Sequence, residues 1–447
     1  METTLASVRQ QNFQNLEWIE VVLFLSDLKY LDVKKISVWK EQFGNITIAS
    51  PAKRPEKIQS DITWHTVEND GKRALIWNLM LSQTQKNWVL FLEDDESIHL
   101  SSIPDRQRLN NETWCPTLIR QARKWGFHQY YQMRLIHTSD EIIFDGINLP
   151  DCTRYIRKKD IKLLNHSIII ERDTDPTDHI DINEELSIKK YSPKLYLISG
   201  ERYLNEKKYV RAAAQFRRLL KEEKLLPFDR LGGVNGLASC LVEQYKWNKA
   251  MTLSNESLSA ESLQSVPYLI QFKIYELRKE WEKAYDMIKR YYEQFSLYSR
   301  ASFDKIIDEE ETLVDLANVA LKAGKRREAT SYFEKLFTFK REEVDRALLK
   351  KVLVLSIELN DFERSVYLFE RIYKDDFLDT LSDEREEELD DIMTMFMKRE
   401  WYTYVSQIYT KLHNLHPENR KYKRKLIVAL TKTNRLDKAK AMLTGIV

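Results

Sequence analysis

A short apolar run in this sequence ends at four consecutive acids. The stretch "NWVLFLEDDESIHL" occupies residues 87–100, and its acids are Glu93, Asp94, Asp95 and Glu96. Carboxylates held this close repel one another unless a cation or water offsets their charge. Because alternate residues of an extended segment point to the same side, Glu93 and Asp95 form one pair and Asp94 points elsewhere. The pattern is typical either of a divalent-cation site or of a solvated strand end.

Short apolar runs alternate with helical patterns up to about residue 185. The predicted strands are residues 19–25, 45–50, 61–66, 88–92 and 141–146, and the predicted helices are residues 30–43, 72–84 and 112–125. Strands that alternate with helices indicate an α/β domain with a mainly parallel, Rossmann-like sheet. Ligands of such sheets bind beyond the carboxyl ends of the strands, where the four acids would lie.

A polar segment, residues 171–193, separates two parts of the chain that differ in pattern. It is rich in Asp and contains Pro176 and Pro193. A calcium loop needs a glycine at its sharp turn and an uninterrupted ligand spacing, so this composition favours a linker. We therefore expect an α/β domain over residues 1–185 and a second domain over residues 186–447.

From about Tyr196 onward all predicted elements are helices, and their pattern repeats. In the first copy, Gly200 and Ala212 are the small residues, and Tyr203 and Phe216 are the aromatic ones. Later copies recur near the ~34-residue period of the tetratricopeptide family, which this half of the chain resembles. The resemblance implies an all-α solenoid of about seven helical pairs, with a concave face that binds a protein or peptide. A purely structural or self-associating array is the alternative.

The composition of the 447-residue chain argues against several classes of protein. Its formal net charge is +2, which predicts neither a nucleic-acid-binding protein nor a polybasic membrane protein. No apolar run approaches the ~18 residues of a transmembrane helix, and the first residues lack the apolar core of a signal peptide. The three cysteines, Cys115, Cys152 and Cys240, form no CxxC pair. These features favour a cytoplasmic protein in a reducing compartment.

Four features carry a second resemblance. They are the opening "LASVRQQNFQNLEWIEVVLF", the segment "ENDGKRALIWNLMLSQTQKNWVLFLEDDE", the segment "YYQMRLIHTSDEIIFDG", and the order of α/β domain, linker and repeats. Together they resemble family-2 glycosyltransferases of the GT-A fold that carry tetratricopeptide repeats behind the catalytic domain. The resemblance implies a metal-dependent, inverting transfer of a sugar from a nucleotide-sugar donor to a protein, peptide or glycan acceptor.

The same resemblance assigns roles to residues of this chain. Glu93 and Asp95 would hold Mg²⁺ or Mn²⁺, which offsets the charge that develops on the departing nucleoside diphosphate. His166 stands where such enzymes carry a late metal ligand, although a place in the core is its alternative. Asp151 is the nearest carboxylate that could serve as general base for the acceptor hydroxyl. Arg134 has a structural ion pair as its alternative role. The donor-binding positions are Asn69, Gly71, Asn78, Glu93, Asp94 and Arg134.

Several positions depart from the family's pattern. The first strand, which should precede the first helix at the centre of the sheet, is apparently lacking, and Ser26 and Asp27 are displaced from the place of the base-binding Asp. Trp77 stands where an arginine is usual, with Lys72 or Arg73 as its substitute. These departures favour a second hypothesis, a non-catalytic scaffold with a decayed transferase domain and partner-binding repeats. The sugar, the acceptor and the oligomeric state do not follow from the sequence.

Overall fold

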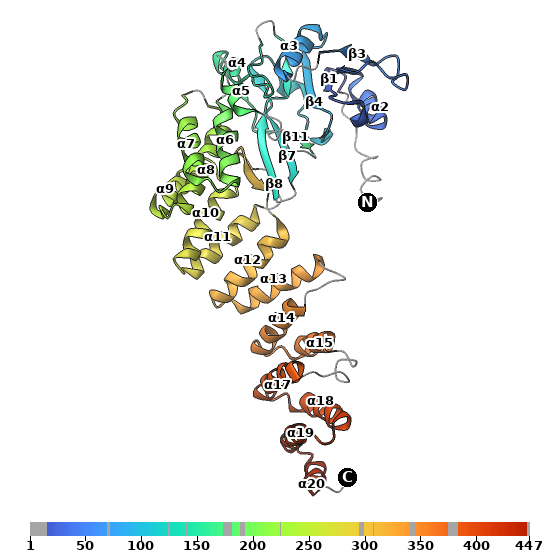
Figure 1. Cartoon of the computed structure of the whole chain (residues 1–447), viewed down its shortest axis with the longest axis vertical. Helices are drawn as coiled ribbons and strands as arrows, with labels where there is room; N and C mark the ends of the chain where they lie inside the picture. The colour runs from blue at the N-terminus through green and yellow to red at the C-terminus, as the bar shows by residue number, and fades with distance from the viewer. Residues whose placement is uncertain are drawn as a thin grey trace. The chain divides into compact units, whose positions relative to one another are not determined.

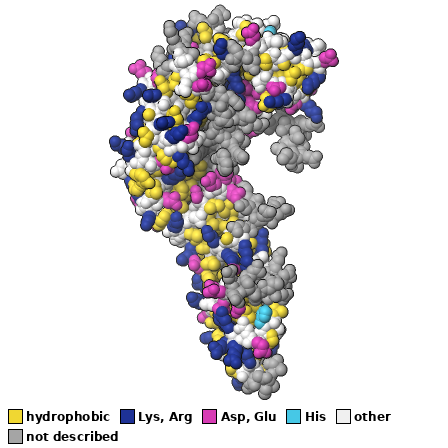
Figure 2. Space-filling view, viewed as in Figure 1, with side chains coloured by type: hydrophobic (Ala, Val, Ile, Leu, Met, Phe, Trp, Pro, Cys, Tyr) yellow, Lys and Arg dark blue, Asp and Glu magenta, His cyan; other side chains and the backbone are white. Residues whose placement is uncertain are grey.

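The structure, a computed structural model, describes residues 16–68, 72–123, 126–139, 142–172, 181–187, 193–223, 225–294, 299–306, 308–339, 346–373 and 383–444. The chain divides into two compact units, Met1–Asp308 and Glu309–Val447. The first unit contains the sheets and the first helical pairs, and the described residues of the second unit form helices (Figure 1). Charged side chains of both signs are spread over the visible surface (Figure 2).

The first sheet is mostly parallel, as the sequence predicts. Its strands are β1 (Ile19–Phe24), β2 (Asn45–Ser50), β3 (Thr63–Thr66), β4 (Trp88–Glu93) and β9 (Leu135–His137). The order is β3-β2-β1-β4-β9, and only β9 runs antiparallel to its neighbour. Helix α2 (Val33–Phe43) connects β1 to β2, and helix α3 (Arg73–Gln83) precedes β4. Every residue of β1 and β4 is buried, which agrees with their mainly apolar sequences.

Strand β1 lies at the centre of this sheet, between β2 and β4. The expectation that the central strand is missing is therefore corrected, because Ile19–Phe24 pairs on both sides and occupies that place. The sequence pattern counts "IEVVLF" as the second strand because it takes the residues before it as the first helix. Residues 1–15, where that helix is predicted, lie outside the described residues.

The second sheet is mixed. Its strands are β5 (Glu96–Ile98), β7 (Thr117–Arg123), β8 (Gly126–Gln132), β11 (Ile168–Arg172) and β12 (Asp304–Ile306), and a separate pair is β6 (Thr113–Trp114) with β10 (Lys162–Leu163). The order is β12-β8-β7-β11-β5, and only β7 and β11 run parallel. The predicted helix 112–125 is therefore wrong. Leu118 and Ile119 are consecutive and both fully buried, because β7 lies at the centre of the sheet and both of its faces are covered there.

Short elements complete the α/β region. They are the 3₁₀ turns η2 (Leu28–Tyr30), η3 (Leu100–Ser102) and η4 (Arg106–Arg108), and the helices α4 (Thr153–Lys158) and α5 (Ile182–Ser187). The described part of the predicted strand 141–146 forms no strand, and only Asp145 pairs, through its backbone, with Asp151. Helix α5 shows that the predicted linker is structured over residues 182–187.

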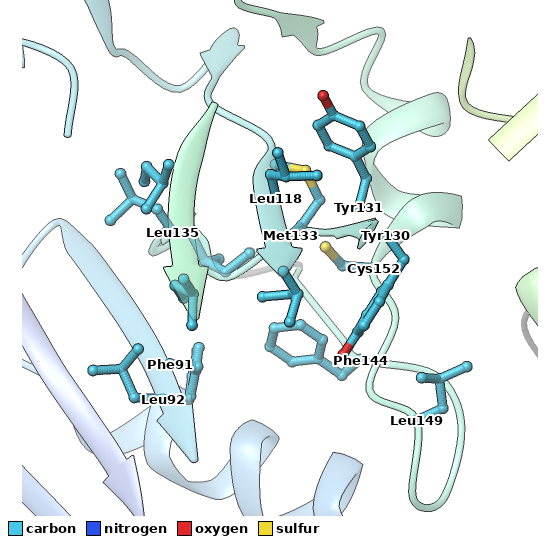
Figure 3. Packing of buried hydrophobic residues seen from close by; sticks show 14 of the residues in the cluster. Phe91, Leu92, Leu118, Tyr130, Tyr131, Met133, Leu135, Phe144, Leu149 and Cys152 are labelled. Carbon is cyan, nitrogen blue, oxygen red and sulfur yellow. The ribbon is translucent and has the colours of Figure 1, made fainter. Parts of the chain in front are cut away.

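Aromatic packing fixes the end of β4. Trp77 of α3 stacks on Phe91 with 4.6 Å between ring centroids, and Phe144 meets both rings edge-on. Figure 3 shows Phe91 and Leu92 of β4 in the same apolar core as Leu118 of β7. The acidic run therefore begins at a strand end that the core holds in place.

The helical region contains seven described pairs. Three lie in the first unit, namely α6 (Lys194–Asn205) with α7 (Tyr209–Leu220), α8 (Pro227–Glu243) with α9 (Trp247–Ala260), and α10 (Val266–Leu277) with α11 (Trp281–Glu293). Four lie in the second unit, namely α12 (Glu309–Lys322) with α13 (Arg326–Phe339), α14 (Arg346–Glu358) with α15 (Phe362–Ile372), α17 (Asp383–Lys398) with α18 (Tyr402–Leu415), and α19 (Arg420–Lys432) with α20 (Leu436–Thr444). Among the described residues, every helix is too short or too polar to cross a membrane.

Each pair has the same turn. The second residue after the helix adopts a left-handed conformation, with φ between 58° and 74°, and the next residue donates its N–H to a carbonyl five positions earlier. Lys208, for example, donates to Tyr203 at 2.8 Å. This hydrogen-bond pattern is the Schellman motif that ends many helices. The left-handed residues are Lys207, Tyr245, Lys279, Gly324, Asn360, Glu400 and Asn434. The recurring turn confirms the helical-repeat region.

The small and aromatic residues of the first copy pack together. The ring of Phe216 is fully buried between Gly200 of α6 and Gly236 of α8. A Cβ atom at Gly200 or Gly236 would lie 2.5 Å or 2.3 Å from that ring. Glycine at these two positions therefore lets neighbouring helices approach one another across the aromatic side chain.

Strand β12 corrects the prediction that only helices follow residue 196. It pairs with β8, and the N–H of Phe303 donates to the carbonyl of Gln129 at 2.6 Å. On its other side, the carboxylate of Asp304 accepts hydrogen bonds from the backbone and hydroxyl of Ser265 at 2.7 Å and 2.9 Å. The segment thus joins the second sheet to the start of α10. A three-residue strand carries no periodic pattern, so the sequence gives no sign of it.

Candidate functional site

The acids lie where the strand order of the first sheet reverses. From β1 the sheet continues to β2 and β3 on one side and to β4 on the other, and such switch points form the ligand crevice of open α/β sheets. Ser26 follows β1 and donates its N–H to a carboxylate oxygen of Asp94 at 3.0 Å, and its hydroxyl donates to the same oxygen. Asp94 is thus held by a partner that Glu93 and Asp95 do not share.

Arg172, the last residue of β11, contacts the other three acids. Its Nη2 lies 2.8 Å from Glu93 Oε2, its Nε lies 3.0 Å from Asp95 Oδ2, and its Nη1 lies 3.3 Å from Glu96 Oε1. The side chains of Arg172 and of these three acids are all almost fully buried. Glu93 and Asp95 therefore act as a pair, as alternation predicts, but the cation between them is an arginine.

Two further arginines complete the group. Arg134 donates from Nη2 to Glu96 Oε1 at 2.8 Å, and its guanidinium lies 4.8 Å from the ring centroid of Trp77. Arg73 Nη1 lies 3.1 Å from Glu93 Oε2. Three guanidinium groups thus balance three carboxylates. We call this group the acid–arginine cluster; its members are Glu93, Asp95, Glu96, Arg73, Arg134 and Arg172.

Burial and pairing act in opposite directions on the carboxyl groups of the cluster. The side chains of Glu93 and Glu96 are 3% and 0% exposed. Burial raises the pKa of Glu96 above its ordinary value. Burial also acts to raise the pKa of Glu93, but the guanidinium groups of Arg172, Arg73 and Arg134 outweigh it and lower this pKa to about 2. Glu93 is therefore ionised at neutral pH and depends on its arginine partners.

The proposed metal ligands do not come together. His166 precedes β11 and its Nε2 contacts the carbonyl oxygen of Ser102, whereas Arg172 ends the same strand, about 20 Å away at the rise of an extended chain. A metal ion at Glu93 and Asp95 would also compete with Arg172 for the same oxygens. The described residues contain no group of three or more His, Cys, Asp or Glu placed to hold a metal ion. The assignment of Mg²⁺ or Mn²⁺ stays a prediction.

The predicted donor-binding residue Asn78 makes a structural contact. Its side chain accepts from the N–H of Phe144 at 2.7 Å and donates to the carbonyl of the same residue at 3.0 Å. This pair of bonds fixes α3 to the segment before Gly146. Asn69 and Gly71, the other two positions of that motif, lie outside the described residues.

Asp151, the candidate general base, lies at the start of α4. Its carboxylate accepts from the N–H and the hydroxyl of Thr153 at 3.1 Å and 2.6 Å. The preceding Pro150 carbonyl accepts from Gln132, whose side-chain oxygen accepts from Arg134 at 3.0 Å. Asp151 is thus linked to the acid–arginine cluster through two intermediate hydrogen bonds, and its carboxylate satisfies the first turn of a helix.

The sequence analysis does not identify two buried charged residues that make long-range contacts in this region. The first is Arg172, whose only signal is a charged residue at the end of the apolar run "SIIIER", a position that calls for a buried counter-ion. The second is Glu185 of α5, which is fully buried and accepts from the N–H groups of Ile147, Asn148 and Leu149. It sits in the segment that the composition marks as a linker, so no sequence signal indicates its role.

A second candidate site is the inner groove of the first three helical pairs. It has a volume of about 220 Å³ and lies between α6, α8 and α10. Its floor includes Asn235, which is 3% exposed and bonds to Gln264 and Ser257 at 2.8 Å and 2.7 Å. Both charges and apolar side chains line it. The lining residues are Glu201, Leu204, Asn205, Lys207, Tyr209, Gly232, Asn235, Gly236, Ser239, Val242, Glu243, Val266, Leu269, Ile270, Lys273 and Phe303.

Comparisons with known proteins add little to this geometry. No protein-family model and no curated protein matches the sequence. A crystal structure of MamA protein is 14% identical over 41% of this chain and 90% of its own, with a TM-score of 0.31. The structure of Pseudomonas aeruginosa pilF is 16% identical over 52% of this chain and 95% of its own, also with a TM-score of 0.31. Similarity at this level carries no argument about function.

Proposed function

We propose that this protein is a partner-binding scaffold whose helical pairs hold an extended segment of another protein. The observation that carries the proposal is the inner groove of α6, α8 and α10. Glu201 and Glu243 supply negative charge, and Lys273 supplies positive charge, beside the apolar Leu269 and Phe303. A lining of both polar and apolar groups suits an extended peptide, whose backbone needs hydrogen bonds while its side chains need apolar contacts.

The acid–arginine cluster supports the same proposal. A metal-dependent transferase needs carboxylates that are open to a cation, whereas Glu93 and Asp95 contact Arg172 at 2.8 Å and 3.0 Å. Each carboxylate of the cluster forms an ion pair within the protein, so its main role is structural. The α/β region then acts as the support on which the helical pairs are built.

Selection of peptides on the full chain tests the proposal. Ser239 of α8 lines the groove, and Ser239→Trp would fill it, whereas Ser259→Trp on the exposed face of α9 is the matched control. We expect peptides selected from a display library to bind the Ser239→Trp variant at least tenfold more weakly, with no change for the control variant. Peptides that bind both variants as well as the wild type, or a library that yields no binder, would refute the groove as the binding site.

One observation favours a second candidate, the transfer of a sugar from a nucleotide-sugar donor to a protein, peptide or glycan. Asp94 and Ser26 meet at the switch point of the first sheet, where a ligand would bind. Thermal unfolding with UDP- and GDP-sugars, with and without Mn²⁺, separates the two functions, since a bound donor raises the unfolding temperature by mass action. A rise that needs Mn²⁺ and is lost in Asp95→Ala would favour the transferase.

A further inference from the structure

Positive charge is concentrated on the last helical pair. Between Asn419 and Lys440 the sequence holds nine Lys or Arg and a single acid, Asp437. The whole chain has a net charge of only +2, so the rest of the chain is net negative. Lys and Arg gather over the C-terminal helices in Figure 2. Charge that is segregated in this way indicates a surface for an anionic partner, which the overall charge conceals.

Most of these cations face away from the helical core. Lys421 and Lys425 pair with Asp390 of α17, the first at 3.4 Å. Six other cations have no ion-pair partner among the described residues, and all of them but Lys423 are exposed. We call them the basic face; its members are Arg420, Lys423, Arg424, Lys432, Arg435 and Lys438.

The helical geometry of α19 separates this basic face from the packed side. Arg420 and Arg424 lie four residues apart, so they occupy the same side of the helix. Tyr422 and Leu426, which are 3% exposed, pack on the opposite side against the rest of the repeat. Arg420, Arg424 and Val428, spaced by four residues and all exposed, therefore lie along one outer side of α19.

Apolar side chains are exposed among the cations. Val428 of α19 is 48% exposed, and Leu436 and Leu443 of α20 are 46% and 68% exposed. Leu436 and Leu443 lie seven residues apart and so share one side of α20. Exposed apolar side chains within a basic surface are the combination that places a helix at the boundary of lipid headgroups and acyl chains.

Other anionic or apolar partners fit this surface less well. A second copy of the chain would bring two basic faces together, and like charges disfavour that contact. Single-stranded nucleic acid uses exposed aromatic rings for base stacking, whereas Tyr422, the only aromatic residue of α19 and α20, is buried. Nucleic acid also gains nothing from exposed leucine and valine.

We propose that the outer face of α19 and α20 binds an anionic lipid surface. Arg420 and Arg424 contact lipid phosphates, the other cations of the basic face add to the positive potential around them, and Val428, Leu436 and Leu443 enter the headgroup boundary. Clusters of four to eight Lys or Arg on an amphipathic helix bind anionic headgroups in this way. The attachment is peripheral and independent of the peptide groove, which lies on other helices.

Vesicle sedimentation of the full chain tests the proposal. We expect binding to vesicles of phosphatidylcholine with 30% phosphatidylserine at 0.1 M NaCl, and none to pure phosphatidylcholine. The double variant Arg420→Gln, Arg424→Gln should bind about 30-fold more weakly, at the usual contribution of one basic side chain near an anionic surface. Arg327→Gln, Lys351→Gln, which removes two exposed cations from α13 and α14, is the matched control and should bind normally.

A second pair of variants separates lipid from nucleic acid. Leu436→Ser, Leu443→Ser keeps every cation, so its binding to the vesicles should weaken about tenfold, while its binding to a 20-base-pair RNA duplex should stay as it is. The proposal is overturned if Arg420→Gln, Arg424→Gln binds vesicles as the wild type does, or if the duplex displaces the protein from vesicles while the leucine variant sediments normally. Circular dichroism of each variant confirms that a loss of binding is not a loss of fold.

Discussion

Replacement of Glu93 by Gln tests whether the acid run is a charge cluster or a metal site. The substitution keeps the size and the polar end of the side chain but removes its charge. Arg73, Arg134 and Arg172 then face only Asp95 and Glu96, so one buried cation loses its counter-ion. Removal of one partner from a buried ion pair costs roughly 3–5 kcal/mol, because the remaining charge stays out of water.

The lowered pKa of Glu93 gives an independent magnitude. This pKa falls from 4.5 to about 2 on folding, and each unit corresponds to ~1.4 kcal/mol, which amounts to roughly 3 kcal/mol of stability at neutral pH. Because the folded pKa is the lower one, this stabilisation is complete above about pH 5 and is lost as the pH falls toward 2. The two routes agree on a loss of about 3 kcal/mol for Glu93→Gln at pH 7.

Urea unfolding followed by tryptophan fluorescence measures this loss. Nine of the ten tryptophans precede residue 309, so the signal reports mainly on the first unit. The difference in unfolding free energy between wild type and Glu93→Gln should be about 3 kcal/mol at pH 7 and should shrink toward zero near pH 2. Glu112→Gln, at an exposed position, is the control and should change stability by less than about 0.5 kcal/mol.

Two results would refute the charge-cluster reasoning. The first is a Glu93→Gln variant that is as stable as the wild type at pH 7. The second is a wild type that gains stability from millimolar Mn²⁺ while Glu93→Gln does not, since this would show that the carboxylate prefers a metal ion to its arginines. Either result would favour the metal site that the sequence predicts.

Three further substitutions test the packing of the helical pairs. Gly236→Ala places a Cβ 2.3 Å from the ring of Phe216 and should lower the unfolding free energy by about 1–3 kcal/mol in urea titrations. Lys279 has a left-handed backbone conformation, with φ of 58°, which glycine adopts without strain. Lys279→Gly should therefore raise the free energy of unfolding by up to ~1 kcal/mol after the entropy cost of glycine, and raise the unfolding temperature with it. Asp304→Asn puts an amide against the donors of Ser265 and should cost about 1–3 kcal/mol, with faster hydrogen exchange at the start of α10.

Local patterns predict the elements that depend on local physics. The buried runs "IEVVLF" and "WVLFL" correctly indicate strands of a parallel sheet, because such strands are covered on both faces. The Gly200–Phe216 spacing correctly indicates paired helices that approach across an aromatic ring. The same apolar criterion fails at residues 112–125, where β7 is central to a mixed sheet and the run is too short to separate strand from helix.

The features that sequence patterns do not predict depend on contacts between residues far apart in the chain. Arg172 is separated from Glu93 by 79 positions, and no spacing rule connects them. Strand β12 pairs with β8 across a helical region, and Glu185 bonds to a loop 36–38 positions away. These contacts carry no periodic signal of their own, and they turn the acids from an open cation site into a closed cluster.

The position of the four acids between the two sheets gives them a structural role. Strand β4 of the first sheet ends at Glu93, and β5 of the second sheet begins at Glu96, so the acidic run forms the corner where the chain passes from one sheet to the other. Arg134 precedes β9 of the first sheet, and Arg172 ends β11 of the second, so the arginines approach this corner from both sides.

An apolar corner of the same volume would be as stable or more stable, since desolvation offsets most of the attraction within a buried ion pair. Apolar contacts have no preferred direction, however, whereas three guanidinium groups and three carboxylates fit in few arrangements. We therefore expect the cluster to hold the two sheets in one arrangement, so that Glu93→Gln alters the near-ultraviolet circular dichroism of the stacked Trp77 as well as lowers the stability.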